Sequence, residues 1–359
     1  MSRRTPTRAV VADDSHFMRS VISDILEEGG IEVVATAKHG RQAVEMVDEH
    51  DPDVVTMDVE MPEMNGIEAV ERIMASSPTP ILMLSAHTDE KADVTFEALE
   101  KGAVDFFTKP GGEVSMEMSR LKDQLVEMVH SVAEVDPTAR TGSAGSASTD
   151  VAGETVSRPA AEQYVENPTL VIGSSTGGPT VVERVLSELP VGADLRILVV
   201  QHMPDEFTER FADRLDGRSE YAVREAADGD RIGGGEALVA AGGYHMVVSN
   251  YRSGRLRVSL TEDPPVNSVR PAVDVTMESA AEVVTDPLVG VILTGMGEDG
   301  AEGIRAIKRA GGRTLVQDES SSAVFGMPKR AIETGKVDAV RSLDSIAGGI
   351  LDAIEPEVH

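Results

Sequence analysis

The sequence predicts an α/β protein with two domains, each built around a mainly parallel β-sheet. Short apolar runs alternate with amphipathic stretches of helical spacing in both halves of the chain, a pattern typical of consecutive βα units. The length of 359 residues is enough for two separate hydrophobic cores. Residues 141–157 are rich in Gly, Ser, Ala and Thr and cannot bury enough apolar surface to fold, so we expect a flexible linker over about 136–167.

Composition narrows the class of protein. Hydrophobic residues make up 41% of the chain, which is typical of a globular protein, and the absence of cysteine excludes disulfides, thiolate metal sites and a cysteine nucleophile. The net charge of −29 argues against binding to nucleic acid or an anionic membrane and is typical of a surface adapted to high salt. No apolar run reaches about 18 residues and no secretory signal is recognised, so we expect a cytoplasmic protein without direct membrane insertion.

The first half of the chain, up to about residue 133, has five strand-like runs separated by helical patterns. These runs cover residues 8–12, 31–37, 54–57, 80–85 and 105–108. In the first helical pattern, Phe17, Val21 and Ile25 recur four residues apart and form part of a wide apolar face. Five such units imply a parallel sheet that helices cover on both faces.

Charged and polar residues follow the strands of this first sheet. The first strand runs into Asp13 and Asp14, the third into Asp58 and the fifth into Lys109, while the fourth ends in Ser85. Carboxyl ends of parallel strands meet at one edge, where clustered carboxylates repel one another unless a cation joins them. Oxygen ligands of this kind suit Mg²⁺, and a carboxylate beside Mg²⁺ and a lysine can accept a phosphoryl group.

Residues 8–125 resemble the receiver domain of two-component response regulators, a flavodoxin-like fold with a five-stranded parallel sheet. The resemblance is carried by Asp13-Asp14, Asp58-x-x-Met61-Pro62-x-x-x-Gly66, Ser85-Ala86 and Lys109-Pro110. It implies that a histidine kinase is the phosphodonor, that the phosphorylated residue is Asp58, and that Mg²⁺ is the cofactor of this step.

The same resemblance implies roles for the neighbouring residues. Asp14 and Asp58 would hold the Mg²⁺ directly, with Asp13 assisting. Ser85 and Lys109 would contact the phosphoryl oxygens. Phe106 matches the aromatic switch residue of receivers, which turns inward when the residue at the Ser85 position moves.

Strand-like runs return in the second half of the chain. They cover residues 169–172, 196–201, 237–241, 246–248, 256–260, 289–294 and 313–317, and helical stretches such as 206–215, 271–284 and 301–310 lie between them. Around residues 221–260 the strands are closely spaced and separated by Gly-rich turns, so we expect antiparallel pairs there. The remainder predicts a second, doubly wound and mainly parallel α/β domain.

A candidate nucleophile lies between the first strand and the first helix of this second domain. Ser175 is flanked two residues away on each side by Gly173 and Gly177, and this G-x-S-x-G spacing lets a serine hydroxyl project from a cramped strand–turn–helix connection. The helix that follows would direct backbone N–H groups at an oxyanion. A phosphate-binding loop is the less favoured interpretation, because residues 173–178 lack both G-x-G-x-x-G and the lysine of a P-loop.

A serine nucleophile needs a base and a group that orients the base. Only His202, His245 and His359 follow Ser175 in the sequence, and His359 is the last residue. We favour His202, because it directly follows a strand that would deliver it to the same sheet edge, over His245, which falls between two expected strands. The orienting carboxylate is expected in the loop after the strand at 289–294, where we favour Asp299 over Glu298.

Residues 168–352 resemble the catalytic domain of the chemotaxis protein-glutamate methylesterases, the CheB family. The motifs are Gly173-x-Ser175-Thr176-Gly177-Gly178, Gln201-His202-Met203-Pro204, Pro264-Pro265-Val266-Asn267-x-x-Arg270-Pro271-x-Val273-Asp274, Leu293-Thr294-Gly295-Met296-Gly297-x-Asp299-Gly300 and Val324-Phe325-Gly326-Met327-Pro328. The family triad falls on Ser175, His202 and Asp299, and the resemblance places the oxyanion donors near Thr176 and Met296.

Two departures from the family pattern lie beside the triad. Ser174 replaces the usual alanine next to the nucleophile, and Glu298 stands where asparagine is usual. A third departure is Ala241, which replaces a usual proline. None of the three removes a predicted catalytic group.

The two resemblances together imply the function. We expect a receiver at 8–125, a linker at 126–167 and a catalytic domain at 168–355. The expected activity is hydrolysis of glutamate γ-methyl esters on chemotaxis receptors, with deamidation of receptor glutamines by the same acyl chemistry and no cofactor for the ester step. Phosphorylation is expected to relieve a restriction that the receiver places on access to Ser175. Alternative readings are a response regulator that only binds a partner, and a receiver-controlled esterase for another ester.

Overall fold

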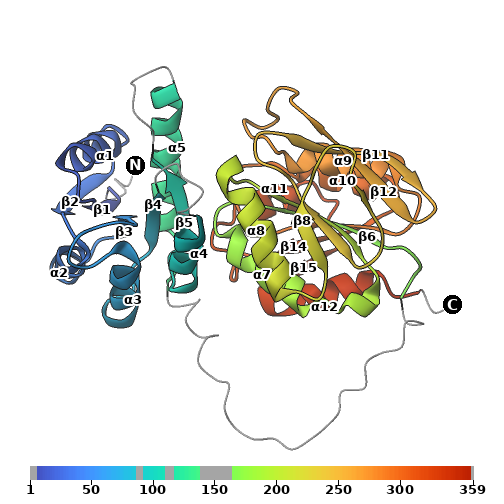
Figure 1. Ribbon diagram of the computed structural model, residues 1–359, viewed down its shortest axis with the longest axis horizontal. Coiled ribbons are helices and arrows are strands. Elements are labelled where there is room, and N and C mark those ends of the chain that lie inside the picture. The colour runs from blue at the N-terminus through green and yellow to red at the C-terminus, as the bar shows by residue number, and fades with distance from the viewer. Residues whose placement is uncertain (1–5, 86–91, 110–116, 138–163, 357–359) are drawn as a thin grey trace, which may run out of the picture. The chain divides into compact units, whose positions relative to one another are not determined.

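The computed structural model describes residues 6–85, 92–109, 117–137 and 164–356 of the chain. The chain divides into two compact units, Met1–Ser148 and Thr149–His359 (Figure 1), which are described separately below. Most of the expected linker, residues 138–163, lies outside the described residues.

The first unit contains a five-stranded parallel sheet in the order β2-β1-β3-β4-β5, as the sequence predicts. The strands are β1 (Arg8–Ala12), β2 (Glu32–Ala37), β3 (Val54–Asp58), β4 (Ile81–Ser85) and β5 (Asp105–Thr108). The helices are α1 (His16–Glu28), α2 (Gly40–His50), α3 (Gly66–Ser76), α4 (Ala92–Glu100) and α5 (Glu117–Ala133). Helices α1 and α5 contact each other on one face, and α2, α3 and α4 follow one another on the other (Figure 1). Helix α5 continues past residue 125, where the sequence placed the start of the linker.

Local sequence explains why these helices begin where they do. Ser15 caps α1 by accepting a hydrogen bond from the Met18 N–H, and Asn65 caps α3 by accepting one from the Glu68 N–H at 2.8 Å. Gly66 is the first residue of α3 and lies very close to the end of β3. A Cβ at this position would overlap the carbonyl oxygen of Asp58, so only glycine fits. The spacing between Asp58 and Gly66 therefore reflects the close approach of this helix to the end of the strand.

The second unit has a seven-stranded sheet, in the order β15-β14-β13-β6-β7-β10-β8, and a separate antiparallel sheet, in the order β11-β12-β9. All neighbours in the larger sheet are parallel. Its strands are β6 (Thr169–Ser174), β7 (Arg196–Gln201), β8 (Ala222–Glu225), β10 (Glu236–Val239), β13 (Leu288–Ile292), β14 (Arg313–Gln317) and β15 (Ala339–Arg341). The smaller sheet contains β9 (Arg231–Ile232), β11 (His245–Arg252) and β12 (Arg255–Thr261).

Helices cover both faces of the larger sheet (Figure 1). Helices α7 (Gly178–Glu188), α8 (Asp205–Arg218) and α12 (Leu343–Ala353) pack together, and so do α9 (Val273–Val283), α10 (Ala301–Arg309) and α11 (Met327–Glu333). A short 3₁₀ helix, η3 (Val191–Ala193), precedes β7. Every residue of β6, β7 and β13 is buried, as expected for central strands of a doubly wound sheet.

The order of this sheet identifies the place where a ligand would bind. From β6 the chain continues to β7 on one side, and later places β13 on the other side of β6. This reversal is a topological switch point, and in open α/β sheets ligands bind outside the carboxyl ends of the strands at such a point. The loops after β6, β7 and β13 carry Ser175, His202 and Asp299.

The region from 221 to 260 differs in part from the sequence expectation. Strands β11 and β12 are the antiparallel pair that was expected, but β8 and β10 are parallel neighbours within the large sheet. The expectation was wrong there because closely spaced strands suggest hairpins, whereas the two-residue β9 lies between β8 and β10 and pairs with β12 instead. Residue His245 is the first residue of β11 rather than part of a loop between strands.

Candidate active site

Ser175 lies in the turn between β6 and α7. Its N–H donates to the Thr294 carbonyl at 3.0 Å, and its own carbonyl accepts from the Gly178 N–H at 2.7 Å, so the backbone on both sides of the hydroxyl is fixed. Gly177, the N-cap of α7, has φ 72°, in the left-handed region. A Cβ on Gly295 would lie 2.8 Å from the Ser175 Cβ, so the loop after β13 packs directly on the serine.

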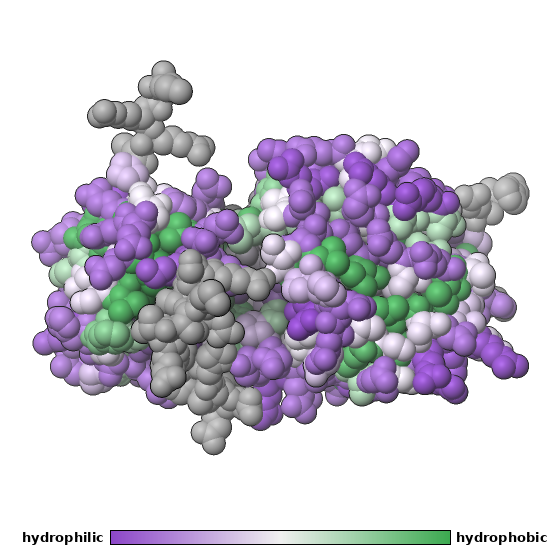
Figure 2. Space-filling view, turned by 90° about the horizontal axis from the view of Figure 1, so that it is seen from above, coloured by the Kyte–Doolittle hydropathy of each residue, from purple (hydrophilic) through white to green (hydrophobic). Residues whose placement is uncertain are grey.

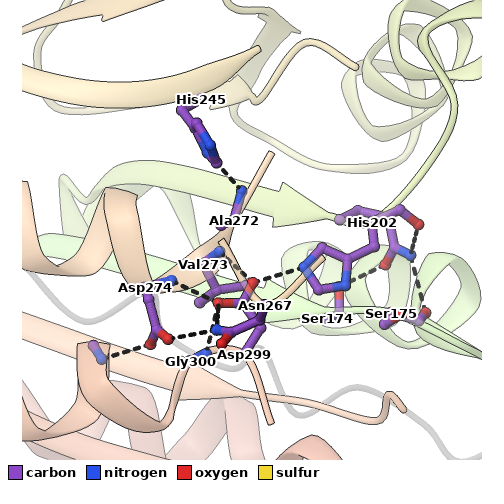
Figure 3. Close-up of polar contacts among 12 residues, drawn as sticks. Ser174, Ser175, His202, His245, Asn267, Ala272, Val273, Asp274, Asp299 and Gly300 are labelled. Atoms are coloured by element: carbon purple, nitrogen blue, oxygen red, sulfur yellow. Dashed lines mark hydrogen bonds and ion pairs between the residues drawn. The ribbon is translucent and has the colours of Figure 1, made fainter. Parts of the chain in front are cut away.

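His202 lies beside this turn because β6 and β7 are paired in register. Ser174 lies opposite Gln201, and the His202 N–H donates to the Ser174 carbonyl at 3.0 Å. The Nε2 atom of His202 lies 2.8 Å from Oδ2 of Asp299 (Figure 3). With the Nε2 proton directed at Asp299, the lone pair of Nδ1 is available as a base.

The described hydrogen bonds do not include one from the Ser175 hydroxyl to His202. The structure therefore brings the predicted base and carboxylate together, and places the predicted nucleophile at the neighbouring strand end. Catalytic hydrogen bonds are often long without substrate and tighten only in the complex.

Asp299 is 2% exposed and is surrounded by hydrogen-bond donors. Besides His202, the donors are the N–H groups of Val273, Asp274 and Gly300 and the side-chain amide of Asn267. Val273 and Asp274 are the first residues of α9, so the carboxylate also lies at the positive end of a helix dipole. Burial alone would raise the pKa of Asp299, but the His202 contact and the N–H groups of Val273 and Asp274 hold it below its usual value. Glu298, the alternative carboxylate, is exposed.

A second buried carboxylate lies next to Asp299. The Asn267 amide donates to Oδ2 of Asp274 at 2.8 Å and to Oδ1 of Asp299 at 3.0 Å, and so bridges the two (Figure 3). Burial and the charge of Asp299 raise the pKa of Asp274 to about 6. Sequence reasoning did not assign Asn267 or Asp274 a role, although both lie in the motif that ends at Asp274. Their contacts depend on how that loop folds back onto Asp299.

His245 is buried and both of its ring nitrogens have partners. Nδ1 accepts from the Ala272 N–H at 3.2 Å, and Nε2 lies 3.2 Å from the carbonyl oxygen of Pro264. Ala272 is the N-cap of α9, so His245 fastens the loop that carries Asn267 to the start of this helix. These contacts favour a structural role for His245 and leave His202 as the candidate base.

Replacement of His245 by Gln is expected to lower the melting temperature while leaving kcat within about threefold of wild type. Gln can reproduce one of the two hydrogen bonds, and loss of the other in a buried site costs about 1–3 kcal/mol. Thermal unfolding followed by circular dichroism, together with the ester hydrolysis rate, measures both effects. His202→Gln is the matched variant, and it should lose activity with little change in melting temperature. A reversed pattern would make His245 the base.

The turn after Ser175 offers a candidate oxyanion donor. Thr176 is 2% exposed, and within the described residues its backbone N–H has no hydrogen-bond partner, while its carbonyl accepts from the Thr294 hydroxyl at 2.9 Å. An unpaired buried N–H is costly unless a ligand uses it. Met296, the other predicted donor, follows Gly295, whose backbone packs on Ser175. Thr176 thus adjoins the proposed nucleophile directly, whereas Met296 is next to the glycine that packs on it.

The predicted phosphorylation site lies at the carboxyl edge of the first sheet. Asp13, Asp14 and Asp58 each offer a carboxylate oxygen, and these oxygens lie within 4.8 Å of one another. Lys109 Nζ lies 2.6 Å from Asp13 Oδ2 and 2.8 Å from Asp58 Oδ1. Burial raises the pKa of Asp58, and the attraction of Lys109 opposes this shift only in part. Three clustered carboxylates are a donor set that suits Mg²⁺.

The predicted switch residues Ser85 and Phe106 lie on the neighbouring strands β4 and β5. Ser85 is fully buried at the end of β4, and its hydroxyl accepts a hydrogen bond from the Thr95 hydroxyl on α4 at 3.2 Å. Phe106 is 6% exposed and packs edge-to-face on Phe96, with ring centroids 6.0 Å apart. Phe106 therefore points inward in this structure.

The chain is similar to known proteins over nearly its whole length. The model of the CheB methylesterase family matches residues 170–350, and that of the response regulator receiver domain matches residues 9–119. A protein-glutamate methylesterase/protein-glutamine glutaminase of Haloarcula marismortui is 69% identical over 98% of both chains. A protein of the same name from Symbiobacterium thermophilum is 42% identical over 97% of both chains.

Among solved structures, the CheB methylesterase catalytic domain of Thermotoga maritima matches with a TM-score of 0.51 and 39% identity. The match covers 53% of this chain and all of that one. In the part of the chain that the structure describes, no helix is long and apolar enough to cross a membrane.

Proposed function

The chain belongs to the CheB methylesterase family and carries a response regulator receiver domain, and on this premise we propose that it is a chemotaxis methylesterase with Ser175 as nucleophile and Asp58 as phosphorylation site. The proposed substrates are glutamate γ-methyl esters of chemotaxis receptors, and the proposed phosphodonor is a chemotaxis histidine kinase. The observation that carries the catalytic part is the 2.8 Å contact between His202 and Asp299 beside the strand end that bears Ser175.

The proposed reaction is acyl transfer in two steps. The Ser175 oxygen attacks the ester carbonyl, His202 Nδ1 takes the serine proton, and the negative charge on the carbonyl oxygen falls near the Thr176 N–H. His202 then gives the proton to the departing methanol. Water attacks the acyl-enzyme with His202 as base and releases the glutamate side chain and Ser175. Asp299 holds the imidazole and stabilises its cation throughout.

Deamidation of receptor glutamines is proposed to use the same groups. The acyl-enzyme that forms is identical, and His202 protonates departing ammonia instead of methanol. The names of the relatives include protein-glutamine glutaminase.

Control of this activity is proposed to lie in the receiver. Asp13, Asp14 and Asp58 would hold Mg²⁺, which supplies positive charge to the oxygens of a transferring phosphoryl group. Asp58 is the proposed acceptor because its carboxylate lies beside Lys109 at the end of β3. Lys109 would then pair with the added phosphoryl charge.

Methanol release from methylated receptor membranes, with and without a small phosphodonor such as acetyl phosphate and Mg²⁺, tests the proposal. The wild-type rate is expected to rise roughly tenfold with the phosphodonor, the size of a typical coupling between two sites. If the protein releases no methanol from receptors but hydrolyses small esters, the substrate assignment is wrong.

Asp58→Asn is expected to abolish the stimulation and to leave the basal rate in place. Asparagine keeps the shape of the side chain and an oxygen for Lys109 but cannot form an acyl phosphate. Asp24→Asn, which makes the same change at an exposed position of α1, should respond like wild type. An unchanged response of Asp58→Asn would place the phosphorylation elsewhere.

A further inference from the structure

A buried amide links the backbones of Ser175 and His202. Ser174 and Gln201 are the last residues of β6 and β7, lie opposite each other in register, and are 0% and 1% exposed. The Gln201 amide nitrogen donates to the Ser175 carbonyl at 2.9 Å and to the His202 carbonyl at 3.0 Å. One side chain therefore holds the main chain of both the proposed nucleophile and the proposed base.

The contacts determine which way this amide faces. Both carbonyl oxygens can only accept, so the atom that faces them is the NH₂ group, and Oε1 faces the opposite side. On that side Ser174 Oγ lies 2.6 Å from Gln201 Oε1, and the serine hydroxyl must be the donor. Of the described residues, Ser174 is the one that donates to Oε1.

The surroundings leave this network little freedom. Gly178, the first residue of α7, packs on the amide so closely that a Cβ there would overlap Gln201 Oε1 and lie 2.9 Å from the Ser174 Cβ. A close-packed buried acceptor without a donor is unfavourable. With a hydrocarbon side chain at position 174, the amide oxygen would lose its donor.

We infer that Gln201 is a positioning residue that sets the separation of Ser175 and His202, and that Ser174 locks the orientation of its amide. The inference rests on the proposed function and extends it. In the structure without substrate, the Ser175 hydroxyl is not hydrogen-bonded to His202. The distance between the main chains of the two residues therefore determines how readily this hydrogen bond forms. A misplacement of about 1 Å in such a pair can cost about 100-fold in rate. This assigns a role to the hydroxyl of Ser174, which lies next to the nucleophile without being one.

Two substitutions in the full-length protein test the inference. Gln201→Met keeps the length of the side chain and removes all three hydrogen bonds, so kcat should fall about 100-fold while KM changes less than about threefold. Ser174→Ala removes one hydrogen bond and should lower kcat about fivefold. The double variant should match Gln201→Met alone, because Ser174 acts through the amide that is then absent.

Two measurements separate positioning from general loss of stability. Thr314→Val is the matched control, since Thr314 is fully buried near the amino end of β14, where its hydroxyl donates to the Lys336 carbonyl and accepts from the Asp338 N–H, without a contact to Ser175, His202 or Thr294. It should lower the melting temperature about as much as Gln201→Met but change kcat less than about threefold. The rate of Ser175 labelling by a fluorophosphonate reports the alignment of nucleophile and base without receptor binding, and should fall with kcat.

The outcomes distinguish this inference from the proposed function. If wild type releases methanol and Ser175→Ala does not, the proposed function holds. Gln201→Met with a kcat and labelling rate near wild type would then overturn the inference, as would additive effects of Ser174→Ala and Gln201→Met. If Ser175→Ala keeps full activity, the proposed function itself is wrong.

Discussion

Ser175→Ala is expected to reduce methanol release from methylated receptors by about 10⁴-fold or more. The change removes the oxygen that is proposed to form the acyl-enzyme, while the turn around it keeps its backbone contacts to Thr294 and Gly178. The variant should therefore fold normally and bind receptor. A residual rate above the uncatalysed one would come from the oxyanion donors and from the binding of substrate.

A serine on the following helix provides the control for this prediction. Ser187→Ala removes a hydroxyl from the last turn of α7, which among the described residues donates to the carbonyl of Arg184. It should leave both the release of methanol and the labelling by fluorophosphonate unchanged. If Ser175→Ala retained more than about a tenth of the wild-type rate, another group would have to be the nucleophile.

The strands that position the site could be predicted because they are central and buried. β6 and β7 consist of uninterrupted buried residues, and their expected ranges, 169–172 and 196–201, agree with the structure to within two residues. Central strands of a parallel sheet have apolar side chains on both faces, which makes them visible in a single sequence. The residues that follow such strands were therefore assigned to the same sheet edge.

Short peripheral strands could not be predicted for the opposite reason. β9 has two residues and β15 has three, and the residues of β15 are half-buried or exposed. Such segments pair because the surrounding fold brings them to an edge, and their own sequence carries little periodicity. The parallel pairing of β8 and β10 likewise depends on the course of the chain between them.

The side-chain hydrogen bonds around the site could not be predicted from the sequence either. Asn267 and Gln201 each act through a side-chain amide that bridges groups on different elements. A motif shows that a residue type occurs at a position but not which way its amide faces. The contacts of the fully buried Arg196 could not be predicted for the same reason. Its guanidinium donates to the carbonyls of Asn167 and Gly254 and lies over the ring of Tyr251, and the fold alone brings these groups together.

Asp299→Asn is expected to lower kcat by about 10⁴-fold with little change in KM. In the structure all five partners of this carboxylate donate to it: three reach Oδ1, and two, His202 Nε2 and the Val273 N–H, reach Oδ2. An asparagine has one accepting oxygen, so in either orientation its NH₂ group faces donors. If the NH₂ group faces His202, Nε2 must become the acceptor and Nδ1 carries the proton. That tautomer cannot take the proton of Ser175.

The neighbouring Glu298→Gln makes the same change of charge at an exposed position and should stay within about threefold of wild type. Circular dichroism should show both variants folded, which separates loss of the base from loss of the fold. Nitrogen NMR of the His202 ring would report the proton on Nε2 in wild type and on Nδ1 in Asp299→Asn. If Glu298→Gln lost activity and Asp299→Asn kept it, the carboxylate of the triad would be Glu298. The hydrogen bonds that converge on Asp299 are the physical reason to expect the opposite.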